Sequence, residues 1–228
     1  PMSPPPPRAS TLDEEELKTQ ALRRVMTGEA TCALGYSEPG SGSDVFAAVT
    51  RARREGDGWR IDGQKMFTSG AESADYVLLL ARTDPDAPKL KGLTMFIVPL
   101  QAEGVTIQAV HTFQDERTNI TYYDGVLVPD SYRLGAVGGG LEVMSTALEI
   151  EQGMSFARYH DELLAAAECF CRETRRHNRP MIEDASVQLR LTRVAINLAA
   201  AQMLHCRTLW NSAERKANPA CGPASKMF

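Results

Sequence analysis

The sequence has no excess of positive charge and no long apolar run. It carries 25 Lys and Arg residues against 29 Asp and Glu residues, a formal net charge of -4 at pH 7. A nucleic-acid-binding protein normally presents a basic face to phosphates, so this balance argues against that class. No apolar stretch approaches the ~20 residues that span a bilayer, which argues against an integral membrane protein.

The N-terminal residues lack the features of a targeting segment. They contain no apolar core of the signal-peptide type, and the acidic run at 13–16 has the wrong charge for a mitochondrial transit peptide. The sequence therefore predicts a cytoplasmic protein.

The cysteines and histidines show no disulfide or metal-binding pattern. Five cysteines are an odd number without paired C-x-x-C spacing, and the four histidines lack an H-x-x-x-H arrangement. We therefore expect reduced, buried thiols and no metal site. No G-x-G-x-x-G follows a predicted strand, so nothing indicates a Rossmann fold. The residues concerned are Cys32, Cys169, Cys171, Cys206, Cys221, His111, His160, His177 and His205.

The order of the sequence patterns predicts an α+β protein with its strands and helices in separate domains. With 228 residues, 43% of them hydrophobic, the chain can bury one large core or two small ones. Residues 12–26 read as a short helix with acidic residues in its first turn. The expected domains are a flexible Pro-rich lead-in at 1–10, a short helical segment at 11–31, a β-domain at 32–130 and part of a C-terminal helical domain at 131–228.

Short runs of β-branched and aromatic residues predict the β-domain. Asp57-Gly58 and Asp62-Gly63 are hairpin signals on either side of Trp59-Arg60-Ile61. About six strands in such a short stretch favour a small antiparallel β-barrel or sandwich. The other expected strands lie at 76–81, 93–98, 105–110 and 120–128.

Beyond Pro129 the hydrophobic period becomes helical. Apolar residues share one face of a helix at 161–176 and one face of a helix at 181–216, which together make part of a helical bundle. These faces are too long for one small β-domain to cover, so we expect a dimer or tetramer, formed by one chain or with a different homologous chain. The face residues are Leu163, Leu164, Ala167, Phe170 and Thr174, and Val187, Leu191, Val194 and Leu198.

The segment at 32–45 is rich in glycine and serine. Gly40 and Gly42 allow unusual backbone conformations and a close approach to a ligand, while the serine hydroxyls are hydrogen-bond donors. Phosphates and flavin edges both need such donors. An ordinary surface loop is the alternative that composition leaves open. The serines are Ser37, Ser41 and Ser43.

The sequence of this segment resembles a known family motif. Ser-Glu-Pro-Gly-Ser-Gly-Ser-Asp at 37–44 is similar to the Thr-Glu-Pro-Gly-Ala-Gly-Ser-Asp signature of the acyl-CoA dehydrogenase family, flavoenzymes that desaturate acyl-CoA thioesters between Cα and Cβ. Asp-Gly-Gln-Lys-Met-Phe-Thr-Ser-Gly-Ala at 62–71 resembles the family's Asn-Gly-x-Lys-x-Trp-(Ile/Thr)-(Thr/Ser)-(Asn/Gly) block. The resemblance runs from residue 22 to the end, and its three further blocks lie at 92–99, 123–129 and 138–141.

The resemblance implies that FAD lies along the first block. Ser37 takes the place of the family threonine that hydrogen-bonds the flavin ring, and Ser43 would contact the cofactor pyrophosphate or the acyl-CoA. The second block would approach the isoalloxazine ring, Ser69 by its hydroxyl. The implied FAD-binding residues are Leu34, Tyr36, Ser37, Gly42, Ser43, Phe67, Thr68 and Ser69.

Some features depart from the family pattern. Phe67 stands where an indole is usual, which keeps an aromatic wall but loses an N–H donor. The family's Arg-x-x-Phe-Gly motif, which reaches the FAD of a neighbouring subunit, is not recognisable around Arg175 to Met181, where the text resembles a subgroup with Gly-Arg-Pro-Leu-Ile. We also expect that the sequence lacks the family's N-terminal helical domain and its last two bundle helices.

The resemblance places a candidate catalytic base at Glu151. Some family members carry the catalytic glutamate in a Leu-x-x-Glu-Arg segment after a Gly-Gly loop, and Leu148 to Gln152 matches it with Gln152 in place of arginine. A helix turns Glu149 and Glu151 about 200° apart, so both cannot face one pocket, and the alignment selects Glu151. The alternatives are a solvated Glu151 and a base beyond Phe228. The candidate substrate contacts are Ser43, Glu149 and Gln152.

The sequence thus predicts an FAD-dependent acyl-CoA dehydrogenase of fatty acid or lipid metabolism. In such an enzyme a carboxylate shielded from water removes the α-proton while hydride leaves Cβ for the flavin. The expected partners are an acyl-CoA thioester, an electron-transfer flavoprotein as electron acceptor, and further subunits. The alternatives are a non-catalytic or partner subunit of a hetero-oligomer, and a flavin-dependent oxidase on the same scaffold.

Overall fold

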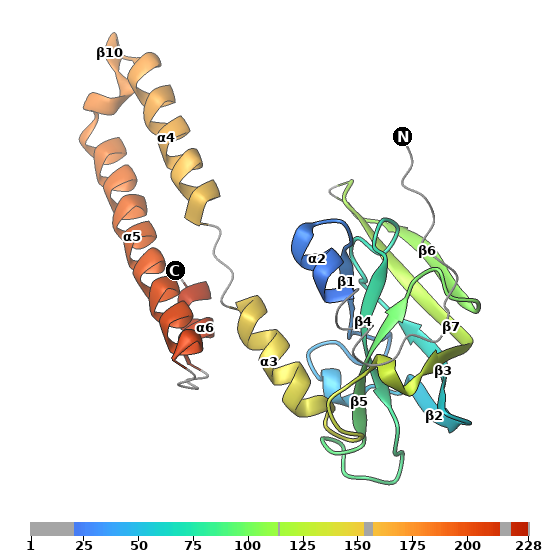
Figure 1. Cartoon of the computed structure of the whole chain (residues 1–228). Coiled ribbons are helices and arrows are strands. Elements are labelled where there is room, and N and C mark those ends of the chain that lie inside the picture. Colours follow the sequence, from blue (N-terminus) through green and yellow to red (C-terminus); the bar gives the residue numbers. More distant parts are fainter. Residues whose placement is uncertain (1–20, 114, 153–156, 215–219, 228) are drawn as a thin grey trace. The chain divides into compact units, whose positions relative to one another are not determined.

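A computed structural model of the chain describes residues 21–113, 115–152, 157–214 and 220–227 (Figure 1). The chain divides into two units, Pro1–Met144 and Ser145–Phe228, which are described separately. Among the described residues, no helix has the length and apolar character that crossing a bilayer requires.

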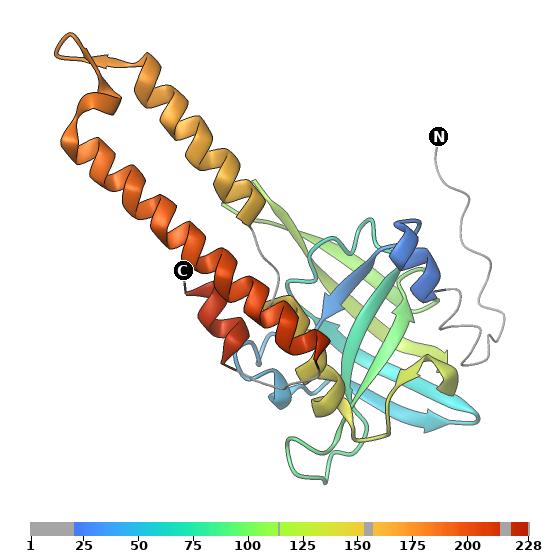
Figure 2. The ribbon, with the colours of Figure 1, turned by 60° about the vertical axis from the view of Figure 1, so that its left-hand side comes forward.

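A mixed eight-stranded sheet makes up most of the first unit. Its strands pair in the order β6-β7-β3-β2-β4-β5-β8, and β1 pairs with β4 beside this path. Figure 2 shows that the sheet is strongly twisted. The bounds are β1 Cys32–Gly35, β2 Arg51–Glu55, β3 Gly58–Lys65, β4 Tyr76–Arg82, β5 Leu93–Pro99, β6 Val105–His111, β7 Arg117–Pro129 and β8 Arg133–Leu134.

Buried and more exposed residues alternate along a strand that has one face toward the core and one toward solvent. Along β3, Trp59, Ile61 and Lys65 are buried and the residues between them are more exposed. By contrast, β4 and β5 are mostly buried, as their continuous apolar runs require. Trp59 packs edge-to-face against Phe96 with ring centroids 5.5 Å apart, inside the core. The predicted strands at 76–81, 93–98, 105–110 and 120–128 are confirmed, although β7 begins earlier, at Arg117.

The predicted small β-domain is confirmed, but its sheet is mixed rather than antiparallel. β1 runs parallel to β4, and β2 runs parallel to β4 at the pair Arg51 and Arg82. Strand composition carries no signal of pairing direction between strands that are distant in sequence, so the parallel pairs were not predictable. Within the described residues β6 and β8 end the path without pairing with each other, so the sheet is open.

Of the two hairpin signals, one is confirmed and one is wrong. Asp57-Gly58 does lie at the turn from β2 to β3. Asp62-Gly63 instead lies within β3, where the pairing with β7 shifts register. Gly125 opposite it has φ +63°, and its N–H donates to Asp62 Oδ1 over 2.9 Å. A Cβ on Gly63, which has φ +146°, would lie 2.8 Å from the Cα of Thr50, so this bulge requires glycine.

Short helical segments precede, interrupt and follow the strands along the chain. The predicted helix at 12–26 is described only from residue 21, where α2 spans Arg23–Thr27 and ends at the left-handed Gly28. The 3-10 turns η2 and η3 span Val45–Ala47 and Asp130–Tyr132. The helix α3, Gly140–Gln152, follows Gly138 and Gly139.

Two long helices form most of the second unit. α4, Ala157–Glu173, and α5, Ala185–Ala213, lie side by side in Figures 1 and 2. Gln202 donates to both carboxylate oxygens of Asp161 across the pair, at 3.0 and 3.2 Å. The two predicted helices are confirmed over 161–173 and 185–213. The connection consists of β9 Arg175–Arg176, β10 Arg179–Pro180 and η4 Met181–Glu183, and α6 Cys221–Lys226 follows α5.

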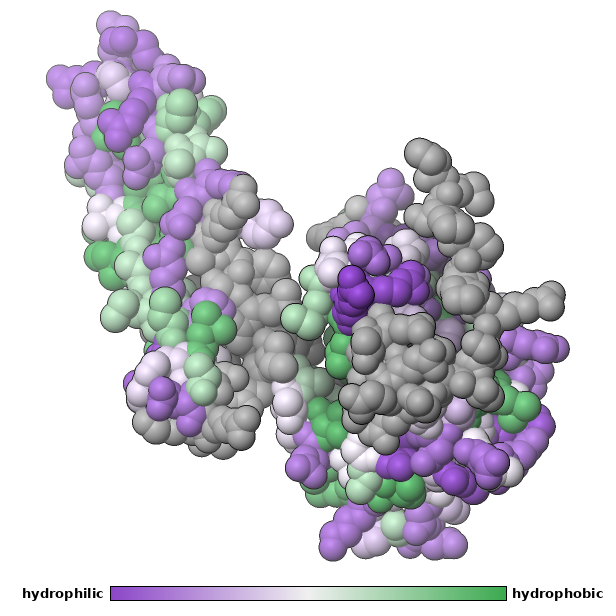
Figure 3. All heavy atoms as spheres, viewed as in Figure 1, coloured by the Kyte–Doolittle hydropathy of each residue, from purple (hydrophilic) through white to green (hydrophobic). Residues whose placement is uncertain are grey.

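Much of the apolar surface of the helical pair is exposed, as the sequence predicts. Leu163 and Phe170 on α4 are exposed, and Figure 3 shows apolar side chains among polar ones along the visible face of the pair. A groove of about 500 Å³ between the helices is lined in part by Leu191 and Ile196. Isolated helices with such faces need a partner to cover them. The exposed apolar residues of α5 are Leu189, Val194, Ile196, Met203, Leu209 and Trp210.

Candidate functional site

The two glycine-containing sequence blocks lie side by side in the first unit. Met66, which follows the end of β3, donates its N–H to the carbonyl oxygen of Ser37, which follows β1 by two residues. The N···O distance is 2.8 Å. The predicted site segments at 34–43 and at 67–69 are therefore joined in space, although β2 and β3 separate them in the sequence.

A buried ion pair connects the same two blocks. The Nζ atom of Lys65 lies 2.7 Å from Oε1 of Glu38, and their side chains are 0% and 2% exposed. Lys65 also donates to the carbonyl oxygen of Tyr36 over 3.2 Å. The Glu38 carboxylate accepts two further bonds, from the N–H of Val49 at 2.7 Å and of Thr50 at 3.0 Å. Three separate segments thus converge on one carboxylate.

Burial and pairing act in opposite directions on this pair. Burial raises the pKa of Glu38, but the Lys65 ammonium and the donors of Val49 and Thr50 outweigh it and hold that pKa below its ordinary value of 4.5. Burial lowers the pKa of Lys65 from 10.5 to about 8, and Glu38 offsets only part of this effect. Both groups are therefore charged at pH 7.

The first block forms a tight turn after Tyr36. Glu38 and Ser41 exchange backbone hydrogen bonds of 2.8 and 3.1 Å around Pro39 and Gly40. Ser41 is buried, so of the three serines only Ser37 and Ser43 reach the surface.

The backbone argument for the two glycines of this turn is wrong. Neither Gly40 nor Gly42 has a positive φ, so neither needs glycine for its conformation. A Cβ added to either residue would meet no protein atom within 4 Å. The space where a Cβ would lie is therefore open at both glycines.

Phe67 has an unusual backbone and an unusual exposure. Its φ is +57°, a left-handed conformation that is rare for an aromatic residue, and its side chain is 61% exposed. Thr68, the next residue, is fully buried. Its N–H donates a hydrogen bond of 2.9 Å to the carbonyl oxygen of Asn119, which fixes the backbone next to Phe67. An exposed, strained aromatic ring next to an anchored residue is a frequent feature of functional sites.

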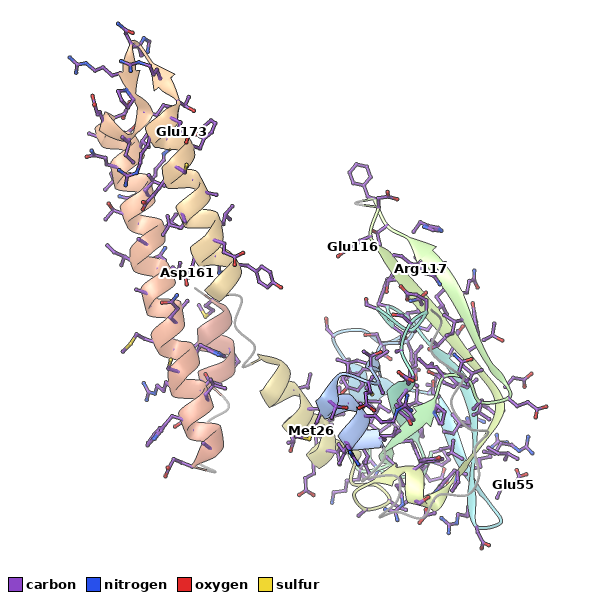
Figure 4. All side chains as sticks on the ribbon, turned by 45° about the horizontal axis from the view of Figure 1, so that its top comes forward. Met26, Glu55, Glu116, Arg117, Asp161 and Glu173 are labelled. Atoms are coloured by element: carbon purple, nitrogen blue, oxygen red, sulfur yellow. The ribbon has the colours of Figure 1, made fainter. Side chains whose placement is uncertain are left out.

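Polar side chains at the start of β7 support the second block, and the sequence did not reveal this role. The buried Asn119 donates to the carbonyl oxygen of Thr68 at 3.1 Å and to the Glu72 carboxylate at 2.5 Å. It accepts from Nε of Arg117 at 3.0 Å; Figure 4 labels Arg117 at the start of β7. The hydroxyls of Ser69 and Thr118 lie 3.1 Å apart. Residues 119, 121 and 123 alternate as buried positions of β7, so a period of two could have predicted an inward Asn119. The predicted strand began only at residue 120, because Asn119 is polar.

The surface next to these two blocks fits the chemistry of a flavin. Leu34 is 41% exposed on β1, Phe67 is exposed beside Ser69, and Ser37 and Ser43 supply hydroxyls. A flavin ring needs apolar contacts on its faces and hydrogen-bond donors at its edge. Tyr36 and Thr68 are buried beneath this surface and so support it.

The candidate base and two of the candidate substrate contacts lie in the last turns of α3. The helix extends through Gln152, so Glu149, Glu151 and Gln152 are helical. Their side chains lie outside the described part of the structure, and the assignment of Glu151 stays a prediction. Among the described residues, no group of three histidine, cysteine or acidic side chains could hold a metal ion.

Comparison with known proteins matches both units. The family model of the acyl-CoA dehydrogenase middle domain matches residues 33–122, and that of the acyl-CoA dehydrogenase C-terminal domain matches residues 138–228. The acyl-CoA dehydrogenase FadE26 of Mycobacterium tuberculosis is 40% identical over 141 residues, which are 60% of this chain and 35% of that protein. Benzylmalonyl-CoA dehydrogenase of Aromatoleum aromaticum is 27% identical over 95% of this chain and 58% of its own.

Solved structures of the same kind share the fold. A Tcur3481-Tcur3483 steroid acyl-CoA dehydrogenase variant superposes with a TM-score of 0.85 at 34% identity, over 93% of this chain and 55% of that one. A glutaryl-coenzyme A dehydrogenase in complex with glutaryl-CoA gives a TM-score of 0.87 at 26% identity, over 95% and 56%. The chain therefore spans between about a third and three fifths of the length of these relatives.

The buried pair generates a prediction about acid stability. Because the pKa of Glu38 is lower in the folded protein than its ordinary value, its contribution is complete above pH 4.5 and is lost as the pH falls through the folded pKa. Glu38→Gln should lower the free energy of unfolding by ~3–5 kcal/mol at pH 7, since it leaves Lys65 buried and unpaired. The difference from the wild type should shrink steadily below pH 4.5.

Urea unfolding at pH 7 and at several lower pH values measures this difference. Glu103→Gln, at an exposed position, serves as the control and should follow the wild type throughout. A Glu38→Gln deficit that stays constant down to pH 3 would contradict the assignment of an ionised, paired Glu38.

Proposed function

The chain belongs to the acyl-CoA dehydrogenase family, and we propose that it supplies the flavin-binding and acyl-CoA-binding part of an FAD-dependent acyl-CoA dehydrogenase. The observation that carries this proposal is the junction of Ser37 with Met66, which brings the two family blocks together beside an exposed, left-handed Phe67. The enzyme would introduce a double bond between Cα and Cβ of a thioester.

FAD, when bound, accepts the hydride that leaves Cβ of the substrate. The residues of this chain would bind and orient it. Leu34 and Phe67 would contact the ring, and Ser37 and Ser69 would hydrogen-bond its edge. Because the hydroxyl oxygens of Ser69 and Thr118 lie within hydrogen-bond distance, the Ser69 side chain is held in place and would lose little entropy on binding. Gly42 and Ser43 would lie along the pyrophosphate or the acyl-CoA.

Glu151 is the base that we propose for removal of the α-proton. A carboxylate at the end of α3 becomes basic enough if flavin and thioester exclude water from it, because desolvation raises the pKa of a carboxyl group. Gln152, the next residue of the helix, would then contact the substrate. We further propose an electron-transfer flavoprotein as the acceptor of the electrons.

Gly42→Val tests the proposed cofactor contact. Since a Cβ added at Gly42 meets no protein atom within 4 Å, the variant should fold with nearly unchanged stability yet lose FAD binding. Titration of the flavin-free protein with FAD, followed by flavin fluorescence, measures the affinity, and thermal unfolding without FAD measures the stability.

Gly40→Val is the matched control, because Gly40 has equally open surroundings and lies outside the predicted contacts. Retention of full FAD affinity in Gly42→Val would remove Gly42 from the site. A wild-type protein that is colourless after incubation with excess FAD and removal of the unbound FAD would contradict the proposed function itself.

Glu151→Gln tests the proposed base. The variant should keep flavin and acyl-CoA binding but lose turnover by several orders of magnitude, because an amide cannot accept the α-proton. Anaerobic bleaching of the bound flavin by an acyl-CoA gives the rate, and Glu142→Gln, at an exposed position in the first turn of the same helix, is the control. Near-normal turnover in Glu151→Gln would assign the base to another part of the polypeptide.

The exposed apolar faces of α4 and α5 support a proposal about assembly. We expect a dimer or tetramer, because burial of these faces removes apolar surface from water. Sedimentation velocity at micromolar concentration should report a stable oligomer, and Leu163→Lys together with Phe170→Lys should weaken it. A stable wild-type monomer would contradict this proposal.

A hetero-oligomer with a non-catalytic member is the second candidate, since two relatives are described as two-protein assemblies, Tcur3481-Tcur3483 and the ChsE4-ChsE5 complex of Mycobacterium tuberculosis. In that case this chain would bind its partner through α4 and α5, and the flavin titration described above would separate the roles.

A further inference from the structure

The Glu38–Lys65 ion pair has a position that packing alone does not explain. It lies within the sheet unit, with both side chains almost completely buried. Moving two charges from water into a protein costs free energy that their attraction does not always return, and apolar residues of similar volume often stabilise a fold as well. A buried pair at this place therefore needs a role that an apolar pair could not perform.

The directed contacts of the pair indicate that role. Lys65 donates to the Glu38 carboxylate and to the carbonyl oxygen of Tyr36, so its ammonium joins the end of β3 to two residues of the first block. Glu38 also accepts from the N–H groups of Val49 and Thr50. Apolar side chains could fill the same volume, but they could not fix these backbone atoms relative to one another.

The residues that the pair joins are direct neighbours of the proposed flavin contacts. Ser37 precedes Glu38 and follows Tyr36, while Phe67 comes two residues after Lys65. The Met66 to Ser37 hydrogen bond lies between them. A shift of Lys65 relative to Glu38 would therefore change the distance between the Ser37 hydroxyl and the Phe67 ring.

We propose that Glu38 and Lys65 are positioning residues, which hold the two walls of the flavin site at a fixed separation without touching the cofactor. This inference rests on the proposed function, because the two walls are its predicted FAD contacts. Its physical basis is preorganisation: supporting contacts keep binding groups in place, so that less ordering is left to the moment of binding.

A comparison of single and double variants separates positioning from a merely structural role. Glu38→Gln and Lys65→Met each leave one buried charge unpaired, so each should lower both stability and FAD affinity. The double variant has no unpaired charge, and its unfolding midpoint without FAD should return close to that of the wild type. Its FAD affinity should stay at least about tenfold weaker, because the bonds to Tyr36, Val49 and Thr50 remain lost or weakened.

The matched control is the exposed ion pair of the β2–β3 hairpin. Glu55 and Arg60 form a salt bridge at the surface, and Arg60 precedes Lys65 by five residues on the same strand. Glu55→Gln combined with Arg60→Met should change neither the FAD affinity nor the unfolding midpoint appreciably. Visible circular dichroism of the bound flavin adds a readout of ring position, which should change in the Glu38 and Lys65 variants alone.

Amide hydrogen exchange of the flavin-free protein keeps this inference separate from the proposed function. In the double variant the amides of Ser41 and Met66 should exchange at least about tenfold faster although the unfolding midpoint is restored, since these two bonds depend on the local geometry of the pair. Unchanged exchange, or an FAD affinity restored together with stability, would overturn the positioning role. Failure of the wild type to bind FAD, with the exchange difference present, would overturn only the flavin function.

Discussion

The constraint on which the site depends is the burial of one positive and one negative charge inside a small β-unit. Neither Glu38 nor Lys65 can leave its place without leaving the other unpaired in a medium that solvates charge poorly. The turn that contains Glu38, the end of β3 and the backbone at 49–50 must therefore assemble together. Because β3 is held by β7 on one side and β2 on the other, the sheet carries this constraint to the site.

The sequence predicted much of the fold because strands and helices follow local periods. The strands at 76–81 and 93–98 are continuous apolar runs, and β4 and β5 follow them closely. Pairing direction is a long-range property, so the parallel contact of β1 with β4 had no local signal. Asp62-Gly63 was misread for a similar reason: a hairpin turn and a bulge both need a flexible glycine, and only the partner strand distinguishes them.

The candidate site was predictable from the similarity of its two segments to family motifs, but not from the properties of their individual residues. Composition suggested that Gly40 and Gly42 have special backbones, yet both have ordinary ones. The support that Asn119 gives to the second block was missed, because residue 119 is polar and precedes the run of apolar residues that marked the strand. Distances between residues far apart in sequence determine these roles, and a single sequence contains no such distances.

Phe67 shows how the sheet stabilises a conformation that its own residue disfavours. A left-handed aromatic residue costs about 1–2 kcal/mol, and its side chain gains no burial in return because it is exposed. The compensation comes from Thr68, whose N–H and carbonyl groups both bond to Asn119 on β7. The ring is thus held outward by its neighbour rather than by its own contacts. Because Phe67 already has a fixed backbone conformation, it would lose little conformational entropy when a ligand binds against its ring.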